Sequence, residues 1–230
     1  MKRSYVQRIF SEIAPRYDLL NRLLSGGIDR SWRRAAIAAL GVERRPAGTY
    51  LDLCAGTLDV GAAISRQPGF CGHIVGADFA EPMLRAGRGK ASPAVLAPVV
   101  ADALALPLSD ASCDGAIVAF GIRNVIDVRA AFHEVLRVLA PGGRFVVLEF
   151  STPHSALVRW TYELYSRRVL PLVGALISGH PTAYRYLPES IAQFPSGEKL
   201  RAVMIEAGFA GVSVTPLTFG VAAIHVGEKR

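Results

Sequence analysis

The sequence predicts an α/β fold with a seven-stranded, mostly parallel sheet and helices on both faces. From Thr49 onward, strand-like apolar segments alternate with helical ones, which implies right-handed βαβ crossovers. A glycine turn joins the first strand to its helix, and an acidic residue ends the second strand. The strands are expected at 49–54, 73–77, 96–100, 114–119, 144–149, 211–216 and 221–226, the last two as a hairpin at the sheet edge. The helices of this part are expected near 59–67, 81–90, 127–139 and 197–208.

Three short helices precede the first strand and are expected to cover a site. Residues 4–13 and 17–25 form two helical segments separated at Ala14-Pro15, because proline disfavours helix in the residue before it. Asp29 is expected to cap a third helix that runs to Leu40 and stops at Gly41. We therefore divide the single domain into a helical cover (1–45), a cofactor-binding core (46–150), a helical insertion (151–195) and a C-terminal helix with a hairpin (196–230).

The stretch Leu51–Gly61 contains the strand, the glycine turn and the start of a helix. In open α/β sheets such a turn lies at the carboxyl edge of the first strand, where a nucleotide-like ligand meets a helix N-terminus. The dinucleotide fingerprint needs three glycines, and here those places hold Cys54, Gly56 and Leu58. A pyrophosphate is therefore disfavoured, whereas S-adenosylmethionine, which has no phosphates, needs only one glycine and free backbone groups.

Acidic and polar residues follow the next strands. Asp78 ends the second strand at the distance from Gly56 that suits a hydrogen bond to ribose hydroxyls; the alternative is an exposed turn aspartate. Asp102-Ala103 follows the third strand, where the carboxylate can accept from an adenine amino group, although loop aspartates usually cap or turn. Gly121–Asn124 follows the fourth strand and places a guanidinium and an amide over the expected ligand, unless Arg123 is simply a surface arginine.

Charge is concentrated at the two ends of the chain. The net charge is +7, and residues 1–45 hold ten basic and four acidic side chains. A basic segment can bind nucleic acid or an anionic membrane surface, or can be only a solvated face. Its arginines alternate with apolar residues as in amphipathic helices, which argues against a disordered RNA-binding tail. We expect no nucleic acid partner, and we keep peripheral contact with an anionic membrane open.

Cysteine usage and hydropathy indicate a cytoplasmic protein. The three cysteines, Cys54, Cys71 and Cys113, occur singly, which argues for a reducing compartment and against structural zinc or disulfides. No metal site is expected. The N-terminus lacks the apolar region of a secretory signal, and the longest apolar run, 169–177, is far shorter than a spanning helix. We expect a cytoplasmic enzyme; the membrane contact that we keep open would be with the inner face of the membrane.

Six segments of the chain form recognisable motifs: Phe10–Asn21, Leu51–Thr57, Gly76–Met83, Phe120–Val125, Pro141–Arg144 and Tyr184–Ser190. The most specific motifs in them are Tyr-Asp-x-x-Asn, Phe-Gly-x-Arg-Asn-Val and Tyr-x-Tyr-Leu-Pro-x-Ser. Together the segments resemble the ubiquinone/menaquinone biosynthesis C-methyltransferase family, within the class I S-adenosylmethionine-dependent methyltransferases, and the resemblance covers nearly the whole chain.

The resemblance implies a Rossmann-like sheet that binds S-adenosylmethionine. It implies that Thr57, Asp78 and Asp102-Ala103 hold this cofactor, with Arg123 and Asn124 near the quinol head group. The cofactor-binding candidates are therefore Asp52, Gly56, Thr57, Asp78, Phe79, Asp102 and Ala103, whereas Arg123 and Asn124 are candidates for catalysis. The chain departs from the family pattern in two places: Leu58 stands where the family usually has glycine, and Ala119 stands where some relatives have a cofactor-contacting serine.

The implied reaction is methyl transfer to a ring carbon of a prenylated hydroquinone. Demethylmenaquinol is the expected acceptor, because the N-terminal cover looks more like that of menaquinone-pathway members of the family. A ring carbon is a poor nucleophile until a neighbouring hydroxyl loses its proton, so the site needs a base and a group that stabilises the phenolate. Arg123 suits the second role. Tyr17 and Asp18 are our candidates for residues that help to remove the hydroxyl proton. Both have structural alternatives, Tyr17 as core and Asp18 as a helix cap.

Other acceptors and a non-enzymatic role stay open at this stage. A ubiquinone-pathway benzoquinol or a soluble aromatic metabolite would use the same chemistry. Leu58 in the cofactor loop would favour a scaffold without activity if it blocked the cofactor. The aromatic segment 157–194 could guide an isoprenoid tail or form a helical subdomain with its own core. We also keep a homodimer as an expectation.

Overall fold

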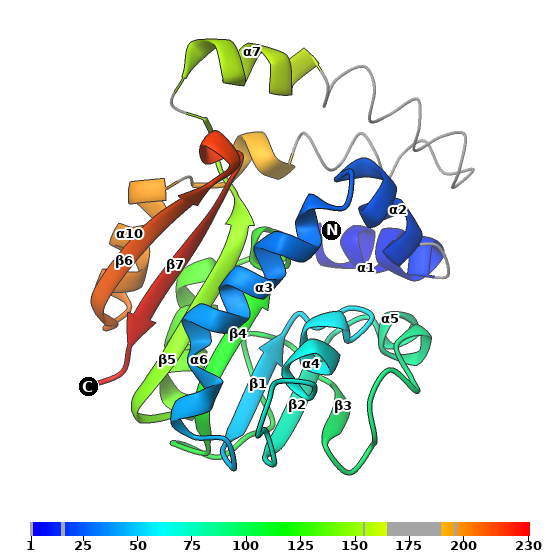
Figure 1. Ribbon diagram of the computed structural model, residues 1–230, viewed down its shortest axis with the longest axis vertical. Coiled ribbons are helices and arrows are strands. Elements are labelled where there is room, and N and C mark those ends of the chain that lie inside the picture. Colours follow the sequence, from blue (N-terminus) through cyan, green and yellow to red (C-terminus); the bar gives the residue numbers. More distant parts are fainter. Residues whose placement is uncertain (1, 15–16, 154, 165–189, 196) are drawn as a thin grey trace.

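One seven-stranded sheet forms the centre of the computed structural model, which describes residues 2–14, 17–153, 155–164, 190–195 and 197–230 (Figure 1). Its strand order is β3-β2-β1-β4-β5-β7-β6. The strands are β1 (Thr49–Leu53), β2 (His73–Asp78), β3 (Leu96–Val100), β4 (Cys113–Ala119), β5 (Leu139–Phe150), β6 (Ala210–Leu217) and β7 (Ala222–Glu228). The α helices are α1 (Lys2–Ile13), α2 (Tyr17–Leu24), α3 (Ile28–Leu40), α4 (Asp59–Ile64), α5 (Glu81–Ala86), α6 (Val128–Val138), α7 (Ala156–Leu164) and α10 (Gly197–Glu206).

The pairing confirms the predicted fold class. Strands β1 to β5 pair in parallel, with Leu51 beside Val75 of β2 and beside Ala116 of β4. The last two strands are antiparallel to each other, and β7 pairs antiparallel with β5. The carboxyl ends of the five parallel strands therefore meet at one edge of the sheet.

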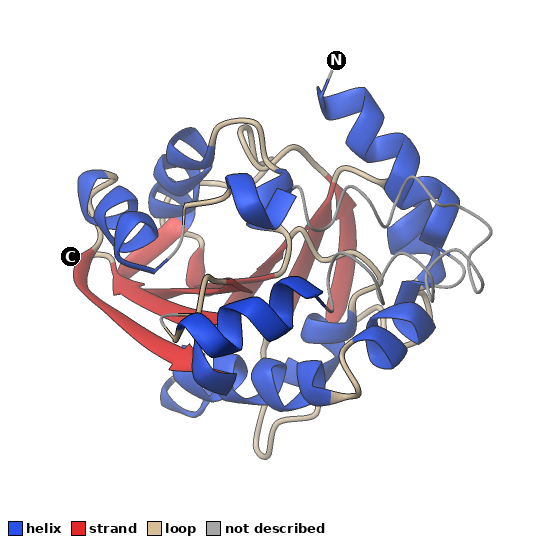
Figure 2. Cartoon of the chain, turned by 90° about the horizontal axis from the view of Figure 1, so that it is seen from above, coloured by secondary structure: helices blue, strands red, loops and turns tan. Residues whose placement is uncertain are grey.

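Successive side chains of a strand point to opposite faces of the sheet, and helices cover each face (Figure 2). Leu51 and Leu53 belong to a buried cluster with side chains of α6 and α10, whereas Tyr50 belongs to a cluster with α3 and α4. The same alternation separates Ala116 and Val118 from Ile117 in β4. This period of two follows from the pleat of the strands, and it fixes the sheet register because a one-residue slip would exchange the faces.

Several predicted boundaries need correction. The helices expected at 59–67 and 81–90 end early, at Ile64 and Ala86. Asp29 is not the cap of α3: Gly27 holds that position with a positive φ, while Asp29 lies in the first turn and accepts a hydrogen bond from Ser25 Oγ. The Pro141-Gly142-Gly143 turn was expected before the fifth strand, but it lies within β5, next to a register shift opposite β4.

Three helices, α1 to α3, precede β1, and part of the expected insertion lies outside the described residues. Helices α1 and α2 lie on the side of the carboxyl edge above α5 (Figure 1), and α1 contacts α5. Of the segment 151–195, the structure describes 151–153, 155–164 with α7, and 190–195; Tyr184, Tyr186 and the rest of 165–189 lie outside the described residues. No described helix is long and apolar enough to cross a membrane.

Candidate active site

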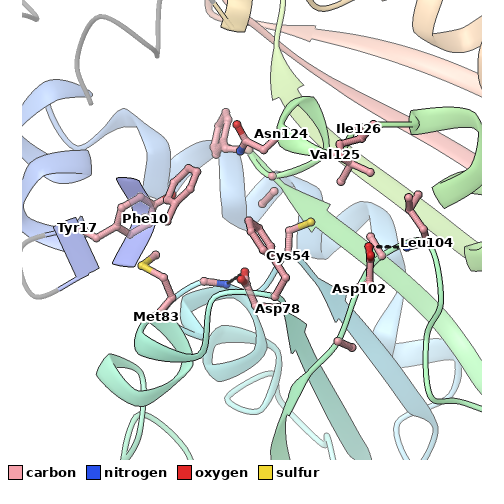
Figure 3. A pocket seen from close by; sticks show the side chains of 17 residues that line it. Phe10, Tyr17, Cys54, Asp78, Met83, Asp102, Leu104, Asn124, Val125 and Ile126 are labelled. Carbon is pink, nitrogen blue, oxygen red and sulfur yellow. Dashed lines mark hydrogen bonds between the residues drawn. The ribbon is translucent and has the colours of Figure 1, made fainter. Parts of the chain in front are cut away.

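A pocket lies at the carboxyl edge, between the ends of the parallel strands and the helical cover (Figure 3). The empty space within it is about 820 Å³ when the open mouth and the adjoining solvent are included. Phe10, Tyr17 and Met83 lie on one side, opposite Asp102, Val125 and Ile126. The other lining residues are Cys54, Gly56, Asp78, Phe79, Ala101, Ala103, Leu104, Ala119, Phe120, Gly121 and Asn124.

The loop after β1 forms the floor of the pocket through an unusual backbone. Cys54, Gly56 and Leu58 all have positive φ, at 53°, 52° and 63°. Only glycine adopts this region without cost, so Cys54 and Leu58 are held there by their surroundings.

Asp52 stabilises the loop from below, because its Oδ2 accepts a hydrogen bond of 2.8 Å from the Gly61 amide. Burial raises the pKa of Asp52 from its usual 3.8 to about 7. Asp52 was a cofactor-binding candidate, but it does not line the pocket.

Leu58 does not intrude into the pocket. Its side chain is buried in the cluster formed with α3 and α4. Gly76 of β2 leaves room for it: a Cβ on Gly76 would lie 2.5 Å from Leu58 Cδ2. The leucine that replaces the family glycine is therefore accommodated behind the loop, and the observation that favoured a scaffold without activity loses its basis.

Asp78 lies where the sequence predicts it, at the end of β2 and in the pocket wall. Its two carboxylate oxygens accept backbone hydrogen bonds of 2.8 Å from Gly56 and Ala80. Burial raises its pKa, and these N–H donors oppose the rise. The carboxylate thus fixes the glycine loop to the second strand, and it retains acceptor capacity for hydroxyl groups because each oxygen has two lone pairs.

The loop after β3 supplies a second polar group and an apolar wall. Asp102 Oδ1 accepts a hydrogen bond of 3.1 Å from the Leu104 amide, which shapes the loop. Ala103 and Leu104 line the pocket beside it, and Phe79 lines it from the end of β2. The structure therefore brings Gly56, Asp78, Phe79, Asp102 and Ala103 together around one cavity.

Arg123 does not line the pocket, in contrast to its predicted position over the ligand. Its Nη1 forms a buried ion pair of 2.8 Å with Oε1 of Glu149 in β5, and the same nitrogen donates to the Phe120 carbonyl. The guanidinium also lies over the Phe150 ring, 5.3 Å from its centre. Burial raises the pKa of Glu149 and Arg123 lowers it. The pair holds the turn after β4 from behind.

That turn presents Asn124 and Phe120 to the pocket instead. Phe120 has a φ of 61°, and its ring packs against Phe150 with centres 4.7 Å apart. Asn124 lines the pocket, at the position after β4 that the sequence predicts. Gly121 is required here, because a Cβ at this position would lie 2.4 Å from Cys54 Cβ.

The two candidates of the helical cover differ in position. Tyr17 lines the pocket and packs edge-on against Phe10, with ring centres 6.0 Å apart. Asp18 lies outside the lining: its Oδ1 accepts a hydrogen bond of 2.5 Å from Thr57 Oγ1, and its Oδ2 pairs with Lys90. Thr57 is itself buried and outside the lining. The sequence predicts that Asp18 helps to remove a proton and that Thr57 binds the cofactor. In the structure these two side chains form a hydrogen bond with each other.

Ten of the lining residues are not among the site residues predicted from the sequence, and Phe10, Cys54, Met83 and Phe120 are four of them. These four lie within segments that carry the family resemblance, which is the signal that could have identified them.

Burial and the neighbouring carboxylates of Asp78 and Asp52 raise the pKa of the Cys54 thiol well above its usual value. The thiol is therefore protonated at neutral pH and is a poor nucleophile there. Among the described residues, no group of His, Cys, Asp and Glu could hold a metal ion.

The sequence is similar to known methyltransferases over nearly its whole length. The sequence model of the ubiE/COQ5 methyltransferase family matches residues 1–229. The chain is 53% identical to the demethylmenaquinone methyltransferase of Thermus thermophilus, over 96% of this chain and all of that protein. It is 46% identical to the ubiquinone/menaquinone biosynthesis C-methyltransferase UbiE of Geobacter sulfurreducens, over 97% of this chain and 88% of that one.

Solved structures share the fold at low sequence identity. A SAM-dependent methyltransferase from Thermotoga maritima has a TM-score of 0.66 at 22% identity, over 97% of this chain and 99% of its own. The [4+2]-cyclase SpnF has a TM-score of 0.71 at 15% identity, over 97% and 94% of the two chains. Because a methyltransferase and a cyclase share this architecture, the fold alone does not define the reaction.

Proposed function

The chain belongs to the ubiE/COQ5 methyltransferase family and is an S-adenosylmethionine-dependent C-methyltransferase, and from this premise we propose that it converts demethylmenaquinol to menaquinol. One observation carries the proposal: a single pocket combines a nucleoside-type polar wall with an apolar aromatic wall supplied by the helical cover. Two relatives with 53% and 47% identity are named demethylmenaquinone methyltransferases, which supports the naphthoquinol acceptor.

The residues of the polar wall fit S-adenosylmethionine. Gly56, with its positive φ, allows a ligand to approach the loop backbone, and the Asp78 carboxylate suits the ribose hydroxyls. Asp102 and the Ala103 amide suit the two edges of an adenine ring. When bound, the cofactor supplies a methyl group on a positively charged sulfur. Ala119, which lines the pocket, leaves space where some relatives have serine.

The opposite wall fits a flat apolar acceptor. Phe10, Tyr17 and Met83 of the cover side face Val125 and Ile126 across the pocket (Figure 3). Aromatic and thioether side chains favour contact with a second aromatic ring. These side chains also exclude water, which favours a reaction in which a phenolate and a sulfonium neutralise each other.

Tyr17 and Asn124 are the pocket residues that we assign to the acceptor hydroxyl. The Asn124 amide can donate a hydrogen bond to a developing phenolate oxygen, and the Tyr17 hydroxyl can donate or accept. Arg123 and Asp18 are already engaged by Glu149, Thr57 and Lys90. We therefore assign Arg123 to the support of the Asn124 turn rather than to the phenolate, and Asp18 to the support of Tyr17.

Helix α7 supports peripheral contact with a membrane, from which a prenylated quinol would enter. Leu157, Trp160 and Leu164 share the same helix face at spacings of three and four residues, and their exposed fractions are 71%, 62% and 42%. Trp at such a position favours the membrane interface, and the basic N-terminal segment favours anionic headgroups. Vesicle flotation with and without anionic lipid tests this contact; equal recovery of Trp160→Ser and wild type would refute it.

An acceptor panel tests the proposed substrate. Purified protein with S-adenosylmethionine is offered demethylmenaquinol with a short tail, a ubiquinone-pathway benzoquinol and a soluble phenol, and products are identified by mass spectrometry. We expect methylation of the naphthoquinol with a higher kcat/KM than of the benzoquinol, and none of the phenol. Preference for the soluble phenol would refute a prenylated acceptor, and cofactor binding without any transfer would favour a scaffold.

The cytoplasmic location and the homodimer stay predictions. Cell fractionation into cytosol and washed membranes tests the first, and light scattering after size-exclusion chromatography tests the second. A monomeric mass over the concentration range of the assay would exclude the dimer as the active form.

A further inference from the structure

A cluster of three charged residues and one hydroxyl joins the helical cover to the cofactor loop. Asp18 is the second residue of α2, Thr57 and Asp59 lie where α4 begins, and Lys90 follows α5. Lys90 Nζ lies 2.5 Å from Asp18 Oδ2 and 2.6 Å from Asp59 Oδ1. Thr57 Oγ1 donates to the other oxygen of Asp18 at 2.5 Å. We call these four residues the cover latch.

The latch brings together parts of the chain that are far apart in sequence. Asp18 and Thr57 are 39 residues apart, and Asp18 and Lys90 are 72 apart. The Lys90 carbonyl in turn accepts a hydrogen bond of 2.7 Å from Arg66 Nη2, which anchors the backbone that carries the amine. Both oxygens of Asp18 are thus engaged from the cofactor side of the molecule.

The latch lies next to the apolar contacts of the cover. Tyr17, the neighbour of Asp18, lines the pocket, and a buried group of Ala14, Ala80 and Met83 packs against Tyr17 and Phe10. Fixing Asp18 therefore fixes the start of the helix that carries Tyr17. Because Asp59 and Thr57 flank Leu58 in the cofactor loop, the same contacts tie the acceptor wall to the cofactor wall.

We propose that Asp18 and Lys90 are positioning residues, which hold Tyr17 in the acceptor wall and close the cover over the loaded cofactor loop. The proposal rests on the proposed function and names how its acceptor half is assembled. Neither side chain touches the reacting atoms. Their effect is on the fraction of molecules whose cover is closed, so it acts on acceptor binding more than on cofactor affinity.

The partial exposure of the latch predicts its salt dependence. The side chains of Lys90, Asp18 and Asp59 are 24%, 32% and 42% exposed. Ions screen such pairs, whereas they screen a buried pair much less. Rising ionic strength should therefore weaken the latch and raise the KM for the acceptor.

The test compares Lys90→Met with the charge-preserving Lys90→Arg and with Arg45→Met. Arg45 pairs with Asp114 at 2.6 Å beside the start of β1, at the amino edge of the sheet, so Arg45→Met is a matched loss of one partly exposed cation. Each variant is assayed for KM and kcat with the short-tailed naphthoquinol, for the Kd of S-adenosylhomocysteine by calorimetry, and for hydrogen exchange of residues 7–24.

We expect Lys90→Met to raise the KM for the acceptor about fivefold, the size of effect that a partly exposed ion-pair network gives. Hydrogen exchange of residues 7–24 should become faster, the Kd of S-adenosylhomocysteine should change less than about twofold, and Lys90→Arg should restore the KM. Salt should raise the KM of the wild type and leave that of Lys90→Met nearly constant.

Three outcomes would overturn the proposal. The first is a KM for Lys90→Met equal to that of Arg45→Met. The second is a lower Tm with unchanged KM and unchanged exchange of residues 7–24, which would indicate a merely structural cluster. The third is an equal effect of salt on wild type and Lys90→Met. Absence of any methyl transfer by the wild type would instead refute the proposed function, while the exchange measurement would still report on the latch.

Discussion

Two charged clusters hold elements that line the pocket, and they differ in burial. Arg123 and Glu149 lie behind the turn after β4, with side chains 6% and 1% exposed. Asp18 and Lys90 lie in front, at 32% and 24%. A buried pair cannot lose one partner without leaving an unpaired charge in a medium of low dielectric, whereas a partly exposed pair can be replaced by water. The rear cluster therefore maintains the fold of the site, and the front cluster adjusts its closure.

Removing the carboxylate of the rear cluster should have the largest effect. Glu149→Ala leaves the Arg123 guanidinium buried without its ion-pair partner, and we expect a loss of about 3–5 kcal/mol in the free energy of unfolding. Glu206→Ala, which breaks the exposed pair with Arg129, should cost less than about 1 kcal/mol. Urea unfolding measures both. Equal losses for the two variants would remove the distinction between buried and exposed clusters.

Truncation of Leu58 tests whether the strained loop residue stabilises the fold without contacting the cofactor. Leu58→Ala should destabilise the protein by about 2–5 kcal/mol because it empties a buried site. Leu58→Gly should be the more stable of the two variants, since glycine tolerates the positive φ. Calorimetry should give an unchanged Kd for S-adenosylmethionine in any variant that stays folded. A tenfold tighter Kd in Leu58→Gly would instead indicate that Leu58 obstructs the cofactor.

A methyl group on Gly121 should disturb the contact between the turn after β4 and the cofactor loop. The new Cβ would meet Cys54 Cβ at 2.4 Å, and we expect Gly121→Ala to cost about 1–3 kcal/mol of stability. The double variant Cys54→Gly/Gly121→Ala removes the clashing atom and should recover part of the loss. Thermal unfolding of the four proteins of this cycle measures the coupling, and additive losses would show that the two loops are independent.

Asp52 should make the free energy of unfolding depend on pH. Its folded-state pKa of about 7 lies above the usual 3.8, so the folded protein binds its proton more tightly than the unfolded chain does. Stability contributed by this proton is complete below pH 4 and is lost as the pH rises towards 7, by on the order of 1 kcal/mol per pH unit. Asp52→Asn should flatten that slope in urea unfolding between pH 4 and 7, and an unchanged slope would contradict the assignment.

The sheet and the polar wall could be predicted from the sequence because both depend on where strands end. Gly56, Asp78 and Asp102 follow from the alternation of strands and helices, since parallel strands meet at one edge. The prediction of helix ends was less accurate: the helices end at Ile64 and Ala86, earlier than expected. Tertiary packing decides how far a short helix continues.

The direction of the charged side chains could not be predicted in the same way. Arg123 turns away from the pocket because Glu149, 26 residues later, is buried behind it and because Phe120 takes a positive φ. Asp18 turns toward Thr57 and Lys90, which no local pattern places beside it. Such contacts join distant segments, so only the packed fold defines them.

The most direct test of this account replaces the rear pair and a pocket residue separately. Arg123→Met/Glu149→Met keeps volume and removes both buried charges, a change that is often neutral for stability. Asn124→Ala removes an amide from the pocket wall. We expect the single-turnover rate of methyl transfer to fall about 100-fold or more in Asn124→Ala, as for a lost oxyanion-hole donor, and to stay within about fivefold in the folded double variant. A double variant with native Tm that is as slow as Asn124→Ala would contradict the account and return Arg123 to the reacting centre.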